Sequence, residues 1–398
     1  MSILGPVEGR EGREGREGRE GREGREGREG RGGIYHAGSA TNSQLSSALL
    51  RVAEELSDDG DFSTRERLVV NDVHQYDLDL SFRKLAKLDT FYRQTIVDYE
   101  MNRLFAPLDT YSSSAKIKVA DPGGNDIYNL QLPAMAPDLN KLLKQQIKFL
   151  KMYMRLRDER FDEILVQQLD MQSFFGALVY LNSSRTPWTM ALLGAVLRFG
   201  TYIISPIKMA IDAPRPTNFT PTVQPMIQTP THGSLPSGHA SQAFMVATVL
   251  AALSETPNVE SVSSQAAIPF DAKAGPFLGR SKLMRLAARI AQNRTVAGVH
   301  YPLDNFAGAG MGLAIGEYIV NALAGTGTTG QYSVDMTSND TILREFDFDY
   351  SEIVTPGSAP GALIERTGTL DISGVAVSPL LQDLWVLARS EMQVAETS

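Results

Sequence analysis

The sequence predicts a mainly α-helical protein, a helical bundle with long loops and a low-complexity N-terminal tail. Apolar residues recur at three- and four-residue intervals along residues 138–170, which is typical of a long amphipathic helix. Four further apolar segments have the length of helices and are separated by loops that carry proline and glycine. These segments are 187–211, 239–254, 280–297 and 302–324. Together they indicate a helical core.

A tripeptide repeat sets the N-terminus apart. EGR repeats from Glu8 to Arg31, with glycine at every third position and acidic and basic residues in equal number. Glycine opposes helix formation, and the repeat lacks the proline of a collagen-like sequence. Residues 1–33 are therefore predicted to be a disordered tail. Its glutamates cancel the field of its arginines, which argues against a nucleic-acid role.

Residues 34–398 are predicted to form a single helical domain. Its parts are an N-terminal helical region, a core that carries the motifs below and a peripheral C-terminal segment, at 34–180, 181–325 and 326–398. Besides the long helix, the first part holds two helix candidates and a loop or short hairpin, at 46–56, 81–105 and 111–136. The last part is polar and β-leaning, and short strands and a final helix near 378–392 are expected there.

The composition is that of an ordinary globular protein and excludes several kinds of site. Hydrophobic residues make up 42% of the chain and charged residues 21%. The net charge of −8 argues against nucleic-acid binding, for which clustered basic charge is expected. Because cysteine is absent, disulfides, thiolate metal ligands and cysteine nucleophiles are excluded, and a metal centre must use nitrogen or oxygen ligands.

Two segments, 189–207 and 306–325, are apolar enough to raise the question of a membrane span. Each is interrupted by a charge, Arg198 or Glu317, and the mean hydropathy of the chain is −0.16. We therefore expect buried core helices and no membrane span. The N-terminal residues lack the basic start and apolar core of a secretory signal, so a cytoplasmic location is expected.

Three short segments collect groups that suit a tetrahedral oxyanion: KMAIDAPRP, PSGH and NRTVAGVHYPLD. They supply three cations, Lys208, Arg215 and Arg294, which can neutralise anionic oxygens, the arginines as charge-assisted forks. The turn at Ser237 and Gly238 precedes a predicted helix, so it adds a hydroxyl and backbone N–H groups at the positive end of a helix dipole. Such an anion site would lie between the core helices.

Histidine is scarce, with five in 398 residues, so the histidines beside these segments stand out. His300 and Asp304 are four residues apart with Pro302 between them, so the carboxylate can reach one ring nitrogen and fix the tautomer. The other nitrogen is then left to attack a substrate or to bind a metal. His239 is left to serve as general acid and base on the opposite side.

Each of these groups, taken singly, also has a structural explanation. Lys208 and Arg215 would be solvated charges at a helix end. Ser237 would be an N-cap, His300 a hydrogen-bonded core histidine and Asp304 a charge that complements a helix dipole. Only their combination favours an oxyanion site.

The spacing of these groups resembles the three-part signature of the type 2 phosphatidic acid phosphatase superfamily. That superfamily includes bacterial acid phosphatases, membrane lipid phosphatases and vanadium-dependent haloperoxidases. The resemblance spans 208–304: Lys, six residues, Arg-Pro; then Pro-Ser-Gly-His; then Arg, five residues, His, three residues, Asp. One departure is Asn293, where the family usually has serine; asparagine retains a hydrogen-bonding side chain.

The resemblance implies roles, position by position. In the phosphatases, the residue that matches His300 is the nucleophile and forms a phosphohistidine, the match of His239 protonates the leaving oxygen, and the match of Asp304 orients the nucleophile. In the haloperoxidases the same cradle holds vanadate, and the match of His300 is the single protein ligand of the metal. Peroxide binds the vanadate, and halide attacks the activated peroxide. Because vanadate mimics the phosphoryl transition state, the motif alone leaves both activities open.

Three features favour a vanadate-dependent haloperoxidase similar to bacterial vanadium haloperoxidases. The composition differs from that of a membrane lipid phosphatase. The chain is longer than the compact acid phosphatases, and a long helical region precedes the motifs. His232 resembles a position where vanadium bromoperoxidases carry histidine and fungal chloroperoxidases an aromatic residue, which indicates bromide or iodide, although a loop histidine packed on prolines is the alternative.

The expected cofactor is vanadate and the expected substrates are hydrogen peroxide and halide; a homo-oligomer is left open. The first alternative is a soluble phosphomonoesterase that takes a phosphate ester, with phosphate in the same site. A further alternative is a helical binding protein whose anion pocket is inert.

Overall fold

The computed structural model describes residues 82–108, 114–134, 136–254, 282–337, 348 and 363–397. The chain divides into two compact units, residues 1–95 and 96–398. The EGR repeat and the helix candidate at 46–56 lie outside the described residues.

The segment 81–105, expected as one helix, contains two: α4 (Phe82–Leu85) and α5 (Thr90–Asn102). The prediction of one continuous helix is wrong because Asp89 acts as a cap. Its Oδ1 accepts a hydrogen bond from the backbone N–H of Tyr92 at 3.1 Å, which satisfies a donor that an unbroken helix would bond internally.

The long helix expected at 138–170 is also divided. It consists of α6 (Ala136–Gln145), α7 (Ile147–Tyr153), the 3₁₀ turn η1 (Met154–Leu156) and α8 (Arg157–Gln167), followed by α9 (Gln172–Gly176). At the start of α8 the Arg157 side chain donates to the carbonyl oxygens of Val223 at 2.7 Å and Val296 at 3.2 Å. These bonds fix α8 against two segments that are distant in sequence, a tertiary contact that helical periodicity does not encode.

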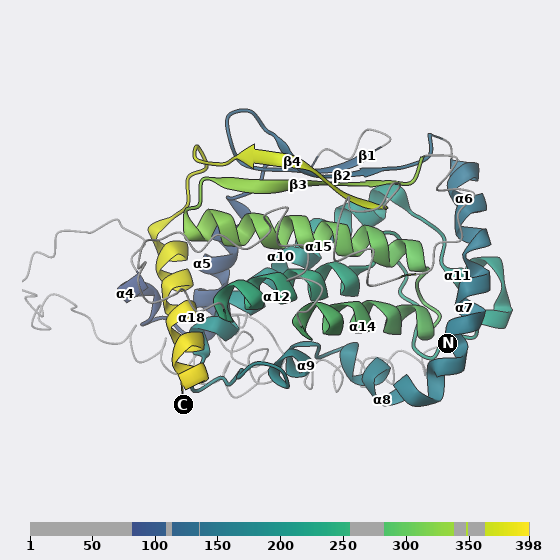
Figure 1. Ribbon diagram of the computed structural model, residues 1–398, viewed down its shortest axis with the longest axis horizontal. Coiled ribbons are helices and arrows are strands. Elements are labelled where there is room, and N and C mark those ends of the chain that lie inside the picture. Colours follow the sequence, from purple (N-terminus) through teal and green to yellow (C-terminus); the bar gives the residue numbers. More distant parts are fainter. Residues whose placement is uncertain are drawn as a thin grey trace, which may run out of the picture. The chain divides into compact units, whose positions relative to one another are not determined.

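The four apolar helices form where they are expected: α10 (Pro187–Ile211), α12 (Gly238–Ser254), α14 (Lys282–Val296) and α15 (Pro302–Ala324). α12 packs against α10, α14 and α15 (Figure 1). Three glycines on one face of α15 allow the closest of these contacts. A Cβ on Gly308 would lie 2.5 Å from the carbonyl oxygen of Ser237, and one on Gly316 would lie 2.8 Å from the Cβ of Thr248. Gly312 faces the Ser241 carbonyl in the same way, so α12 and α15 meet backbone to backbone.

By length and composition two helical stretches could cross a membrane, Pro187–Phe219 and Pro302–Ala324. The apolar window of α15 is 100% buried inside the protein, as expected of a core helix, and that of the first stretch is 50% buried. The charges that interrupt them are partnered. Arg198 pairs with Asp98 at 2.7 Å, and Glu317 accepts from the backbone N–H of Gly330 at 2.8 Å.

A four-stranded sheet accompanies the helices of this mainly α-helical chain. Its strands are β1 (Ser114–Lys118), β2 (Asp126–Gln131), β3 (Thr328–Asp335) and β4 (Ile364–Asp371), in the order β1-β2-β3-β4. β1 and β2 form the antiparallel hairpin expected within 111–136, β2 pairs with β3 in parallel, and β3 pairs with β4 antiparallel. The sheet packs on α15, on the side away from α12 (Figure 1).

The last helix, α18 (Pro379–Thr397), begins where the sequence predicts it and packs on α10. Its Glu391 carboxylate accepts from the backbone N–H groups of Trp188 at 3.0 Å and Thr189 at 2.8 Å. N–H groups in the first turn of a helix have no acceptor within the helix. Glu391 therefore caps α10 and complements its dipole.

Candidate functional site

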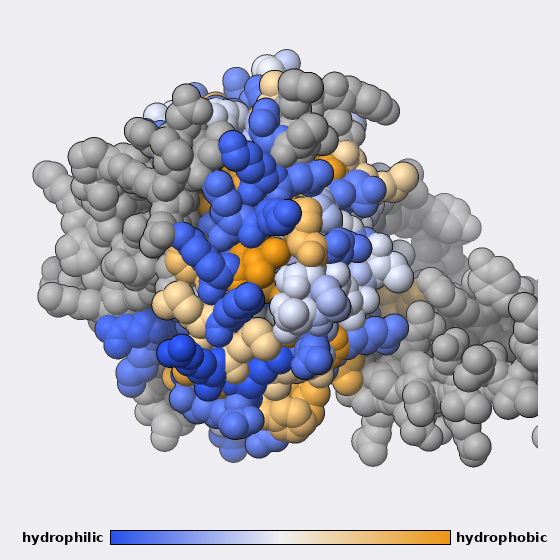
Figure 2. All heavy atoms as spheres, turned by 90° about the vertical axis from the view of Figure 1, so that its right-hand side faces the viewer, coloured by the Kyte–Doolittle hydropathy of each residue, from blue (hydrophilic) through white to orange (hydrophobic). Residues whose placement is uncertain are grey.

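The ends of several helices bring the predicted site residues together. Lys208 lies in the last turn of α10, Gly238 and His239 in the first turn of α12, Arg294 in the last turn of α14, and Asp304 in the first turn of α15. Arg215 precedes α11 (Pro216–Phe219), with the turn η2 (Pro221–Val223) behind it, and His300 lies in the loop before α15. Figure 2 views this end of the core: apolar side chains at the centre of the face are surrounded by hydrophilic ones.

Local backbone features set these positions. α10 ends because Asp212 adopts a left-handed conformation, with φ 45°, and its N–H donates to the carbonyl oxygen of Lys208 at 2.9 Å. Gly298 takes φ 82° in the turn from α14 towards His300. A Cβ there would lie 2.8 Å from Val223 Cγ1, so this turn requires glycine for both conformation and space.

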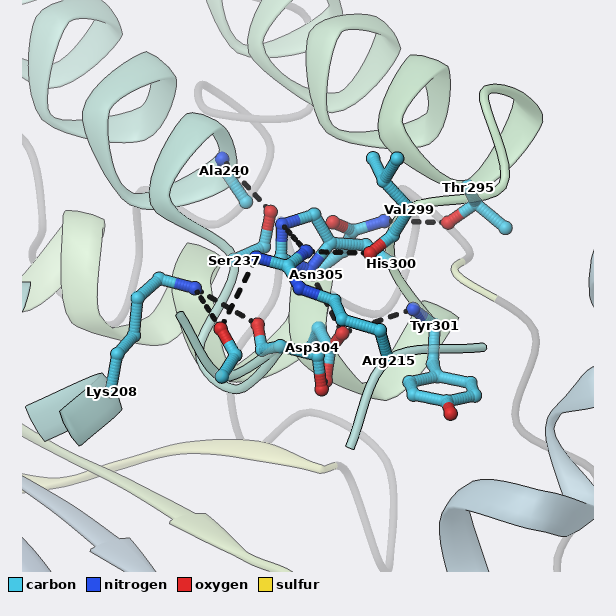
Figure 3. Close-up of polar contacts among 12 residues, drawn as sticks. Lys208, Arg215, Ser237, Ala240, Thr295, Val299, His300, Tyr301, Asp304 and Asn305 are labelled. Atoms are coloured by element: carbon cyan, nitrogen blue, oxygen red, sulfur yellow. Dashed lines mark hydrogen bonds and ion pairs between the residues drawn. The ribbon is translucent and has the colours of Figure 1, made fainter. Parts of the chain in front are cut away.

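Lys208 is buried, with 4% of its surface exposed. Its ammonium donates to the carbonyl oxygens of Gly233 at 3.1 Å and Ser234 at 3.0 Å (Figure 3). Burial and then the charge of Arg215 lower the pKa of Lys208 to about 7, although the carboxylate of Asp304 opposes this. The interpretation of Lys208 as a solvated charge at a helix end is therefore wrong.

Arg215 contacts two of the predicted histidines. Its Nη1 donates to the Val299 carbonyl oxygen at 2.6 Å and lies 3.1 Å from His300 Nε2. Its Nη2 donates to the Gly233 carbonyl oxygen at 3.2 Å and lies 3.1 Å from Nδ1 of the exposed His232. Burial lowers the pKa of Arg215 from its usual value.

His300 and Asp304 form the pair that their spacing predicts, with His300 Nδ1 2.9 Å from Asp304 Oδ2 (Figure 3). Because an arginine can only donate, Arg215 fixes Nε2 of His300 as the acceptor and Nδ1 as the nitrogen that carries hydrogen. Asp304 also accepts from the backbone N–H of Tyr301 at 3.0 Å, so one carboxylate caps α15 and orients the imidazole.

The pKa values of this pair shift in opposite directions. Burial and then the charges of Arg215 and Lys208 hold the pKa of His300 well below its usual 6.5, so the imidazole is neutral. Burial raises the pKa of Asp304 to about 6, although the Tyr301 hydrogen bond and the two cations oppose this.

Arg294 is the most buried of the three cations, with 1% of its surface exposed. Its Nη2 donates to the Ile164 carbonyl oxygen at 3.3 Å and to Gln167 Oε1 at 3.2 Å. Its Nε and Nη1 are buried and form no hydrogen bond within the described chain. Burial lowers the pKa of Arg294 to about 10.

The PSGH turn contacts this cluster through its backbone and its histidine. The backbone N–H of Ser237 donates to the Asp304 carbonyl oxygen at 2.9 Å. A Cβ on Gly238 would lie 3.9 Å from Lys208 Cε, an ordinary contact, so Gly238 borders the lysine. His239 Nε2 lies 3.0 Å from the Gln167 carbonyl oxygen, and because a carbonyl can only accept, this nitrogen carries hydrogen.

Sequence reasoning missed Gln167 and the network behind it. Asn293 donates from Nδ2 to Gln167 Oε1 and to Glu163 Oε2, both at 2.9 Å, and its Oδ1 accepts from Arg160 at 3.2 Å. The asparagine that departs from the family pattern thus binds α8. A signal was present in the sequence, because Arg160, Glu163 and Gln167 recur at helical spacing as a polar stripe on one face of α8.

Within the part of the chain that the structure describes, no group of three or more His, Asp or Glu side chains could hold a metal ion. Comparison with curated proteins finds no match. The family model of the PAP2 superfamily matches residues 188–325, a segment that contains every site residue predicted from the sequence. This match supports the assignment of the segment to the PAP2 superfamily.

Proposed function

We propose that the protein is a vanadate-dependent haloperoxidase that oxidises bromide or iodide with hydrogen peroxide. The observation that carries the proposal is the cluster of three buried cations beside a neutral His300, in a segment similar to a superfamily of phosphatases and vanadium haloperoxidases. The contact of His232 with Arg215 supports the halide assignment, because it joins His232 to the same cluster.

The charge of the cluster favours an oxyanion. Lys208, Arg215 and Arg294 are buried, and the carboxylate of Asp304 faces Lys208 and Arg215. The burial of a cation without a carboxylate partner costs about 3 kcal/mol or more in desolvation free energy. A bound anion would offset this cost.

The residues present fit vanadate. The buried Nε and Nη1 of Arg294 are donors without an acceptor among the described residues, and each could donate to an oxygen of a bound tetrahedral anion. Lys208, Arg215 and the Ser237–Gly238 turn would hold further oxygens, and His300 Nε2 would bind the metal once Arg215 turns from it to the anion. When bound, vanadate supplies the activation of peroxide towards halide. Phosphate has the same shape and sign of charge and fits the same groups.

The chain's own residues would set the protonation states. Arg215 and Asp304 hold His300 neutral with hydrogen on Nδ1, so Nε2 presents its lone pair. The Gln167 carbonyl holds hydrogen on Nε2 of His239, so His239 would gain and lose its proton at Nδ1.

The phosphatase alternative uses the same groups. A neutral His300 of low pKa is a competent nucleophile for a phosphate ester, and His239 would protonate the leaving oxygen. A third possibility is that the pocket binds an anion without chemistry. An assay separates the three.

Purified protein is assayed with vanadate, hydrogen peroxide and bromide by dye halogenation, and in parallel with a chromogenic phosphate ester without vanadate. We expect halogenation that requires vanadate and is lost in His300→Ala. Turnover of the ester alone would establish the phosphatase, and neither activity, with oxyanion binding retained, would leave an inert pocket.

A further inference from the structure

We propose that Gln167 is a positioning residue for Arg294, and that its neutral amide leaves the charge of Arg294 available to the bound oxyanion. The inference deepens the proposed function and rests on the same anion site. It concerns a residue outside the three motifs, at the C-terminal end of α8.

Gln167 joins three helices. It is 1% exposed, and its Oε1 accepts from Arg294 Nη2 at 3.2 Å and from Asn293 Nδ2 at 2.9 Å, both on α14. Its backbone oxygen accepts from His239 on α12. Gln167 Oε1 and the Ile164 carbonyl oxygen therefore hold Nη2 of Arg294, while its Nε and Nη1 have no hydrogen-bond partner in the described chain.

The chemistry of that acceptor matters because Arg294 has no carboxylate partner among the described residues. Its acceptors among the described residues are an amide oxygen and a backbone carbonyl oxygen, both neutral. The nearby carboxylate on α8, Glu163, is committed elsewhere: it binds Arg289 Nε at 2.9 Å and Asn293 at 2.9 Å, and these contacts lower the pKa of Glu163 despite burial.

A neutral acceptor can orient an arginine without cancelling its charge, whereas a carboxylate does both. The arrangement on α8 thus places the negative charge of Glu163 behind Asn293 and puts the amide of Gln167 against Arg294. The uncompensated charge of Arg294 is then directed to an oxyanion.

The test is Gln167→Glu, which keeps the size of the side chain and its acceptor oxygens and adds one negative charge. The dissociation constants of inorganic vanadate and of sulfate are measured by calorimetry, and the melting temperature is measured on the same samples. We expect both dissociation constants to rise by about tenfold or more, the size of one charge-assisted hydrogen bond, with a melting temperature that does not fall.

A matched control is Gln168→Glu, which introduces the same negative charge one residue further along the chain. The Gln168 amide donates to the Leu165 carbonyl oxygen within α8 and not to a site residue. This control should leave both dissociation constants unchanged. Gln167→Met, which removes the acceptor without adding charge, should weaken anion binding and lower the melting temperature together.

The outcomes separate the two proposals. If the wild type binds neither vanadate nor sulfate, the anion site itself is wrong. If the wild type binds them and Gln167→Glu binds them equally well, or loses affinity only in proportion to lost stability, Gln167 is structural and this inference is overturned.

Discussion

Each cation of the site is held by oxygen atoms of the backbone. Lys208 donates to Gly233 and Ser234, and Arg215 to Val299 and Gly233, so the loops that carry the motifs are folded around the cations themselves. These neutral carbonyls orient the charges without neutralising them, which is the property that an anion-binding cluster needs.

Lys208 gives the site a dependence on pH. Its pKa of about 7 in the protein should return towards the usual 10.5 when an anion binds beside it, so binding takes up a proton. Below pH 7 the lysine is already charged and contributes no further change in affinity, whereas above pH 7 affinity should fall by up to roughly tenfold per pH unit. Sulfate is the suitable probe because it does not titrate in this range.

Calorimetry with sulfate between pH 6 and pH 9, in buffers of differing ionisation enthalpy, measures both the affinity and the proton uptake around the Lys208 pKa of about 7. Lys208→Met should bind weakly and lose the dependence. A flat affinity profile in the wild type, with no proton uptake at the alkaline end, would show that Lys208 stays charged in the free protein.

The residues of the motifs could be found from the sequence because histidine is scarce, with five in the chain, and three of the histidines lie in or beside short segments that also carry lysine and arginine. The spacing of His300 and Asp304 across Pro302 predicted their hydrogen bond, since a carboxylate in the first helical turn reaches back to the residue before the helix. Gln167 could not be found in this way, because an amide at a helix end acquires its role only through contacts with α12 and α14.

At the scale of helices, the contact between α12 and α15 sets the positions of the site residues at the ends of these two helices. The two helices approach where Gly308 faces Ser237, and the Ser237 N–H in turn bonds the Asp304 carbonyl oxygen. The distance between the PSGH turn and the His300–Asp304 pair therefore depends on Gly308 having no side chain.

Gly308→Ala should disturb both the fold and the site. The new Cβ would lie 2.5 Å from the Ser237 carbonyl oxygen, so the helices must separate; we expect a loss of about 1–3 kcal/mol in the free energy of unfolding. Anion affinity should fall as well. Urea unfolding and sulfate binding measure the two effects.

Gly374→Ala is the matched control, because a Cβ at Gly374 has nothing within 4 Å. Its stability should stay within about 0.5 kcal/mol of the wild type and its sulfate affinity should be unchanged. Equal behaviour of the two variants would contradict the close contact of α12 with α15.

The helices that sequence predicted well have local signals at their ends. Pro187 and Pro302 occupy the first turns of α10 and α15, where proline is favoured, and both helices begin there. The division of 138–170 into several helices has no such signal, because it depends on Arg157 reaching Val223 and Val296.

In the larger unit as a whole, the sheet joins the region before the motifs to the region after them. β2 pairs in parallel with β3, so residues 126–131 and 328–335 meet on one side of α15. Helical periodicity cannot reveal such a pairing, because its hydrogen bonds link segments far apart in sequence. Glu317, which the sequence marks only as a charge in an apolar run, anchors the sheet through Gly330 and the Tyr332 hydroxyl.

The most direct test of the proposed cradle is a crystal structure of the protein grown with vanadate. We predict that the metal is bonded to His300 Nε2, and that Lys208 Nζ and the Nε and Nη1 atoms of Arg294 lie within hydrogen-bond distance of its oxygens. Vanadate bound elsewhere, or bound at this end of the core without contact to His300 and Arg294, would contradict the site.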